Sequence, residues 1–126
     1  MRRKQLGYPT RCFHCPETDI SCFEEDHPVT EELDPDFKRV VCRNCHRKVE
    51  FSRDIKKLTK NGQRNVKESE GEAFRRYLLL LAEDQDTIAE IVATTPPEAI
   101  TRVLHETAAS IRRKLASITI ADTPGS

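Results

Sequence analysis

The stretches Cys12-Phe13-His14-Cys15 and Cys42-Arg43-Asn44-Cys45-His46 decide how this 126-residue chain folds. Each contains two cysteines separated by two residues, a spacing at which one tight turn presents both thiolates to the same metal ion. The 26 residues between Cys15 and Cys42 allow the chain to leave the first turn and return to the second. The sequence therefore predicts a structural zinc ion with four sulfur ligands, namely Cys12, Cys15, Cys42 and Cys45.

Other ligand sets are open, because His14, Cys22 and His46 could each replace a thiolate. Cys22 lies beside Ile20 and Phe23, which favours a small buried residue. His14 lies inside the first turn, which favours an exposed position. We expect a cytoplasmic protein, because no secretory signal is recognised, and in that reducing compartment paired cysteines indicate metal ligands rather than disulfides.

The composition limits the apolar core, since hydrophobic residues make up 37% of the chain, aromatic residues 6%, and Trp is absent. A metal in the N-terminal part would supply stability that so few apolar residues cannot. The longest apolar run, Tyr77 to Ala82, is far shorter than a membrane span, so we expect no membrane partner. The basic residues at the N-terminus precede no apolar stretch, and we expect no secretory signal.

The net charge of zero conceals a strong segregation of charge along the chain. Residues 17–36 hold nine Asp or Glu residues and no Lys or Arg, whereas residues 38–67 hold eleven Lys or Arg and two acids. A basic block that adjoins a zinc-binding turn indicates contact with a phosphate backbone, although a solvated helix face has the same composition.

Hydrophobic spacing and turn residues predict short strands at 20–23 and 39–42 and helices at 46–58, 70–93 and 97–118. The last two helices are separated by Pro96-Pro97 and are expected to form an antiparallel hairpin. The predicted organisation is a basic N-terminal arm (1–11), a zinc-bound unit (12–58), a linker (59–69), a helical hairpin (70–119) and a frayed tail (120–126).

The run Leu78-Leu79-Leu80-Leu81 is apolar around more than one face of the predicted helix 70–93. We therefore expect this helix to be covered on two sides. Because of the same run, we expect the hairpin to bind either a second copy of the chain, forming a homodimer, or a different protein partner. Covering of the zinc-bound unit by the same helix is the alternative explanation.

An acidic residue and a histidine at the end of a first strand, then a loop, a second strand and Cys-x-x-Cys-His opening a helix form a layout that resembles the HNH endonuclease family. The resemblance covers residues 12–57. It implies a small zinc-stapled ββα-metal (HNH-like) domain and leaves the C-terminal helices unexplained. Together with the C-terminal α-helical hairpin predicted from hydrophobic spacing, the expected fold class is α+β. The residues that match the family pattern are Cys12, Cys15, Asp26, His27, Cys42, Cys45 and His46.

The resemblance also implies roles for three of these residues. His27 would be the general base that takes a proton from water. Asp26 and His46 would ligate a catalytic divalent cation such as Mg²⁺. The chain departs from the family at the position of the middle Asn, because residues 34–41 contain no Asn, and Asp36 is the nearest polar substitute.

Two functions follow as hypotheses. The first is an HNH-like, metal-dependent endonuclease that hydrolyses DNA phosphodiester bonds. The second is a catalytically degenerate zinc module that binds nucleic acid or a protein partner through the basic block. The residues expected to contact DNA are Lys38, Arg39, Arg43, Arg47, Lys48, Arg53, Lys56, Lys57 and Lys60.

Overall fold

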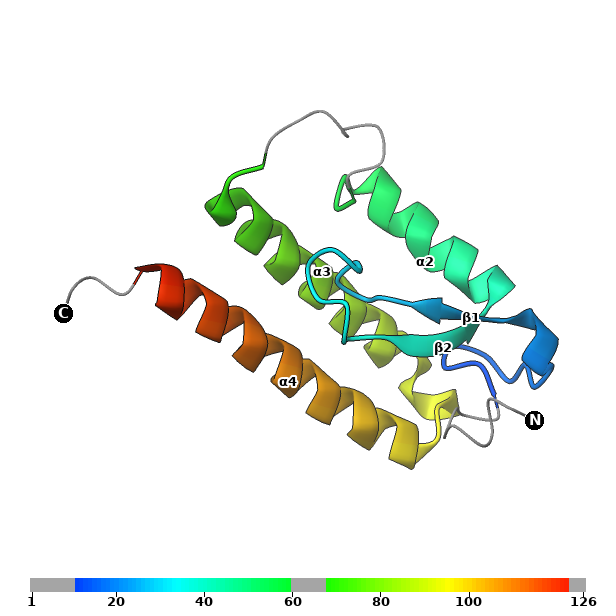
Figure 1. Cartoon of the computed structure of the whole chain (residues 1–126). Coiled ribbons are helices and arrows are strands. Elements are labelled where there is room, and N and C mark those ends of the chain that lie inside the picture. The colour runs from blue at the N-terminus through cyan, green and yellow to red at the C-terminus, as the bar shows by residue number, and fades with distance from the viewer. Residues whose placement is uncertain (1–10, 60–67, 123–126) are drawn as a thin grey trace.

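The computed structural model describes residues 11–59 and 68–122, and in this part of the chain it contains a two-stranded sheet and three α-helices (Figure 1). The mixed class predicted from the sequence is therefore confirmed, while the finer ββα-metal assignment stays a prediction. The elements in chain order are η1 (Ile20–Cys22), β1 (Phe23–Asp26), β2 (Arg39–Cys42), α2 (Arg43–Ile55), α3 (Glu70–Ile91), η2 (Val92–Thr94) and α4 (Pro97–Asp122).

The sheet is a single antiparallel pair of short strands, in which Phe23 lies opposite Cys42 and Asp26 lies opposite Arg39. All four residues of β2 are buried, whereas only the two end residues of β1 are. This register puts the acidic end of β1 at the far end of the sheet from Cys42.

Helix α2 follows β2 without a loop, because Cys42 both ends the strand and caps the helix. The sulfur of Cys42 accepts a hydrogen bond from the backbone N–H of Cys45, the role that a Ser or Asp oxygen usually has at a helix N-terminus. One residue therefore couples the strand, the helix and the cysteine pair. The first turn of α2 then carries His46 at a fixed position beside the sheet.

Helices α3 and α4 form the expected antiparallel hairpin, which packs beneath the sheet (Figure 1). Helix α3 begins with a capping box between Ser69 and Glu72. The hydroxyl groups of Tyr77 and Ser110 are 2.7 Å apart and fix the level at which the two helices meet.

The apolar core joins the zinc-bound unit to the hairpin. One cluster combines Cys12, Phe13 and the strand residues with Ile88 of α3 and Val103 of α4. A second cluster packs Val29 and Phe37 of the loop between the strands against the middle of α3. The predicted zinc-bound unit and the predicted helical hairpin therefore both contribute residues to each apolar cluster.

Most boundaries agree with the sequence pattern, and the differences have local causes. The predicted strand 20–23 is the turn η1, because the carboxylate of Asp19 accepts the backbone N–H of Ser21, and β1 begins only at Phe23. The predicted helix 46–58 begins earlier, at Arg43, and ends at Ile55. Most of the predicted arm, linker and tail lies outside the described residues, as does Lys60.

Helix α3 contacts α2 through Glu83, the sheet through Asp84 and α4 through Tyr77, but one face remains open in the described part of the chain. Leu80 and Leu81 are buried, but the side chains of Leu78 and Leu79 are 49% and 39% exposed. The helix is therefore covered on more than one side, but this covering leaves Leu78 and Leu79 partly exposed. In the same described part of the chain, none of the helices has the length and apolarity that a membrane crossing requires.

A buried ion pair connects the sheet to the hairpin. Nη2 of Arg39 in β2 donates to Oδ2 of Asp84 in α3 at 2.8 Å, and the two side chains are 5% and 3% exposed. The guanidinium also lies over the ring of Phe13, 4.5 Å from its centroid. Arg39 is therefore an internal residue rather than a surface contact for DNA.

Replacing Asp84 by Asn leaves the charge of Arg39 buried without a counter-charge. Breaking one side of such a pair costs about 3 kcal/mol or more, so the free energy of unfolding should fall by about that amount in urea denaturation. The matched control is Lys38→Ala, which breaks the exposed pair with Glu25 and should cost less than about 1 kcal/mol. Equal effects of the two substitutions would contradict the structural role of the buried pair.

Candidate metal centre and the adjoining cleft

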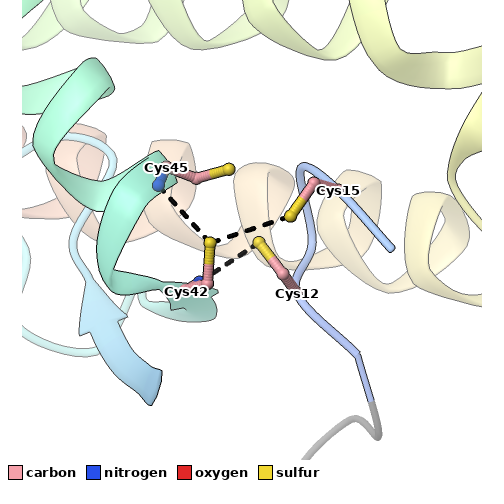
Figure 2. Close-up of side chains that lie close together, drawn as sticks. All are labelled: Cys12, Cys15, Cys42 and Cys45. Carbon is pink, nitrogen blue, oxygen red and sulfur yellow. Dashed lines mark hydrogen bonds between the residues drawn. The ribbon is translucent and has the colours of Figure 1, made fainter. Parts of the chain in front are cut away.

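Four cysteines converge at the junction of the N-terminal loop and α2. Their sulfur atoms all lie within 4.8 Å of one another, and those of Cys15 and Cys42 are 3.7 Å apart. Tetrahedral zinc with Zn–S bonds of about 2.3 Å requires sulfur atoms about 3.8 Å apart. Figure 2 shows Cys12 and Cys15 approaching from the loop and Cys42 and Cys45 from the start of α2. The predicted cluster is confirmed as a set of residues that could hold a metal such as zinc.

Backbone N–H groups point at two of these sulfurs. Sγ of Cys12 accepts from the N–H groups of His14 and Cys42, at 3.3 and 3.1 Å. Burial raises the pKa of Cys12, and it would raise that of Cys42 as well. The hydrogen bonds that Cys42 receives from the N–H of Cys45 and from the neighbouring thiols together outweigh burial, so the pKa of Cys42 lies below its ordinary value. Such hydrogen bonds favour thiolates, the form in which cysteine binds zinc.

The three alternative ligands lie apart from this cluster. Cys22 is within 3.6 Å of a carboxylate oxygen of Asp19. His14 is half-buried rather than exposed, and its ring packs edge-on against Phe13. Burial, together with the positive charge of Arg39, lowers the pKa of His14 to about 4, so its ring is neutral at pH 7.

A separate cavity of about 410 Å³ opens where β1 ends, and it brings together the three predicted catalytic residues. Asp26 and His27 come from the end of β1, and His46 comes from the first turn of α2. Five carboxylates line this cavity against a single arginine, so its electrostatic character is acidic. An acidic cavity attracts a cation and repels a phosphate group unless a cation is bound.

The imidazole of His46 is held between three carboxylates. Its Nδ1 atom is 2.8 Å from Oε1 of Glu24, a contact that lowers the pKa of Glu24. Its Nε2 atom is 3.6 Å from Oδ1 of Asp26 and 3.3 Å from Oε1 of Glu50. The contact with Glu24 therefore turns the other ring nitrogen toward two carboxylates at the cavity.

Glu24 and Glu50 were not among the residues singled out from the sequence, although two periodicities point to them. Glu24 is two residues before Asp26, so both side chains lie on the same face of β1. Glu50 is four residues after His46, so both lie on the same face of α2.

Asp26 and Arg53 form a buried two-point ion pair inside this site. Nη1 and Nη2 of Arg53 donate to the two carboxylate oxygens at 2.6 and 3.0 Å, and Asp26 is 1% exposed. Burial by itself would raise the pKa of Asp26, but the hydrogen bonds and charge of Arg53 outweigh it and hold this pKa below its ordinary value. Because its guanidinium is buried on Asp26, Arg53 is not available to contact DNA.

The remaining predicted DNA contacts lie at the surface. Arg43 and Lys56 are exposed and pair with Glu24 and Glu83, respectively. The other exposed members in the described part of the chain are Lys38, Arg47, Lys48 and Lys57.

The donors at the cavity are of the chemical kinds that bind divalent cations, but in the described part of the chain only the four cysteines form a group of three or more donors close enough to hold a metal ion. Carboxylate oxygens and an imidazole nitrogen are common ligands of such ions. The 3.6 Å between Asp26 Oδ1 and His46 Nε2 is less than twice a metal–ligand distance of about 2.1 Å, so both atoms can contact one ion. Arg53 disfavours the binding of a cation at Asp26, because its guanidinium already balances the charge of that carboxylate.

Comparisons of the chain with protein-family models, with curated proteins and with solved structures found no match. The resemblance to HNH endonucleases therefore rests on the motif residues and stays a prediction.

The purified protein should carry one zinc ion per chain, measured by elemental mass spectrometry. Cys15→Ser should reduce this content to near zero and, because metal binding is coupled to folding, lower the thermal midpoint by more than about 10 °C. Cys22→Ser is the matched control and should keep both the metal and the midpoint. Full zinc occupancy in Cys15→Ser would show that a different ligand set is used.

Proposed function

We propose that this protein is a metal-dependent endonuclease of the HNH type, which hydrolyses DNA phosphodiester bonds in the acidic cavity at the end of β1. The observation that carries the proposal is that Asp26, His27 and His46 line one cavity, although the third comes from a different element. The cysteine cluster supports it, because it lies at the start of the helix that positions His46.

Each residue at the cavity has a role in the proposed reaction. His27 accepts the proton of the attacking water, since a neutral imidazole is a base at neutral pH. Asp26, His46 and Glu50 would hold a divalent cation, which when bound supplies charge neutralisation at the phosphate. Glu24 orients the ring of His46 by its contact with Nδ1.

The exposed basic residues beside the cavity would contact the DNA backbone. Arg47 directly follows His46 on α2 and is exposed, so it can reach a phosphate near the acidic cavity, whereas the exposed Lys48 lines a different cavity and would contact DNA farther away. We further propose that the protein works in the cytoplasm, where thiolate ligands remain reduced.

A zinc-stabilised binding module without catalytic activity is the second candidate. It is favoured by the ion pair between Arg53 and Asp26, which compensates the carboxylate without a metal ion. The absence of the family's middle Asn acts in the same direction. Such a module would bind nucleic acid or a protein partner through Arg43, Arg47 and Lys48.

The endonuclease should nick supercoiled plasmid when Mg²⁺ or Mn²⁺ is added to the zinc-loaded protein. His27→Ala should lower the nicking rate by about 100-fold or more, the usual contribution of a general base. The matched control is His105→Ala, because His105 is an exposed histidine on α4. Full activity in His27→Ala, or nicking without the added cation, would exclude the assigned chemistry.

Binding of a second ion separates the two candidates. Titration of Mn²⁺ into the zinc-loaded protein, followed by electron paramagnetic resonance, should reveal one additional weaker site that is lost in Glu50→Gln. DNA affinity should fall in Arg47→Ala, with a salt slope reduced by about one. Salt-dependent DNA binding with no second ion would select the binding module instead.

A further inference from the structure

Exposed apolar side chains are concentrated on the helical hairpin. Eight large hydrophobic residues in the described part of the chain are at least 39% exposed, and only Phe51 and Ile55 of these are on α2. A contiguous apolar patch on a small protein is typical of an interaction surface. The other six residues are Leu78, Leu79, Val92, Leu104, Ile111 and Leu115.

Five of these six residues fall into two regular rows. On α3 the buried row is Tyr77, Leu81, Asp84 and Ile88, and the exposed row follows one residue later, at Leu78, Ala82, Gln85 and Ala89, and continues to Val92 in η2. On α4 the buried residues Val103 and Ser110 are followed by the row Leu104, Ala108, Ile111 and Leu115. Alternating steps of four and three residues keep each row on one helix face, as in helices that pack against a partner helix.

The contacts of α3 show which way its exposed row faces. Glu83 contacts α2 through Lys56, Asp84 contacts the sheet, and Tyr77 contacts α4. Going around α3 from the side that contacts the sheet, the contact with α4 comes first, and the row that begins at Leu78 comes next.

On α4, Arg113 contacts the loop between the strands at Asp34, and Ser110 contacts α3. The row that contains Leu104 and Ile111 is likewise the next one beyond the contact with α3. Since the helices are antiparallel, the two rows lie side by side on the face of the hairpin that points away from the sheet.

The charges at the two ends of this face are complementary. Because Tyr77 meets Ser110, the exposed residues Arg75 and Arg112 lie at one end, and the exposed Asp86 lies toward the other. Ala82 and Ala108 lie near the middle, where small side chains allow helices to approach closely. A two-fold axis through this middle would place Arg75 of one copy near Asp86 of the other.

We propose that this outer face of the hairpin binds a second copy of the same chain, and that the protein is a two-fold symmetric dimer with four helices at its interface. The proposal does not depend on the proposed nuclease activity. It follows from the apolar rows, the small residues at their centre and the opposite charges at their ends.

Light scattering of the zinc-loaded full chain, coupled to size-exclusion chromatography, should give twice the chain mass of 14.5 kDa. The double variant Leu104→Glu with Ile111→Glu should elute as a monomer with an unchanged helical signal in circular dichroism. The matched control, Phe51→Glu with Ile55→Glu, changes equally exposed apolar residues on α2 and should remain a dimer. A monomeric native protein, or a control that dissociates equally, would overturn the proposal.

A charge exchange tests the symmetry with folded surface variants. Arg75→Glu and Asp86→Arg should each raise the dimer dissociation constant, about 3-fold to 10-fold for a partly exposed pair. The two changes together should restore the native dissociation constant, because the pair is re-formed with its signs reversed. Additive weakening in the double variant would overturn the two-fold arrangement.

Discussion

The junction of four cysteines is the constraint on which the rest of the structure depends. Cys42 ends β2, caps α2 and contributes a sulfur to the cluster, so one residue fixes the direction of both elements. The N-terminal loop is held at the same point through the N–H of Cys42, which donates to Cys12. Since His46 is the fourth residue after Cys42, the cluster also sets where the imidazole enters the cavity. A bound metal would make this arrangement rigid in a chain with a small apolar core.

Two buried ion pairs hold the strands to the helices, in addition to the cysteine cluster. Arg53 holds the end of β1 to α2 through Asp26, and Arg39 holds β2 to α3 through Asp84. Such pairs contribute little net stability when compared with apolar packing, but each partner is costly to remove alone. They therefore specify position: Arg53 with Asp26 at the acidic cavity, and Arg39 with Asp84 where the sheet meets the hairpin. The same Arg53 lowers the demand of Asp26 for a cation, which is why both an enzyme and a binding module remain as proposals.

The sequence predicted the parts that depend on local pattern. The predicted strand 39–42 and the predicted helix starts near 70 and 97 agree with the structure, because apolar spacing and Pro96-Pro97 mark them. The cysteine cluster was predictable for the same reason, because each Cys-x-x-Cys spacing is a local pattern. The burial of Arg39 and Arg53 was not predictable, since their partners are 45 and 27 residues away along the chain. An arginine destined for such a partner has the same sequence signature as one that contacts solvent.

The central claim is that a sulfur-bound metal positions His46 beside Asp26 at a second ion. A crystal structure of the Mn²⁺-soaked protein, with anomalous scattering measured at the zinc and manganese edges, tests it most directly. We expect zinc at similar distances from Cys12, Cys15, Cys42 and Cys45, and manganese in contact with Asp26 and His46. Zinc bound elsewhere, or manganese absent from the cavity while the fold is intact, would contradict the account.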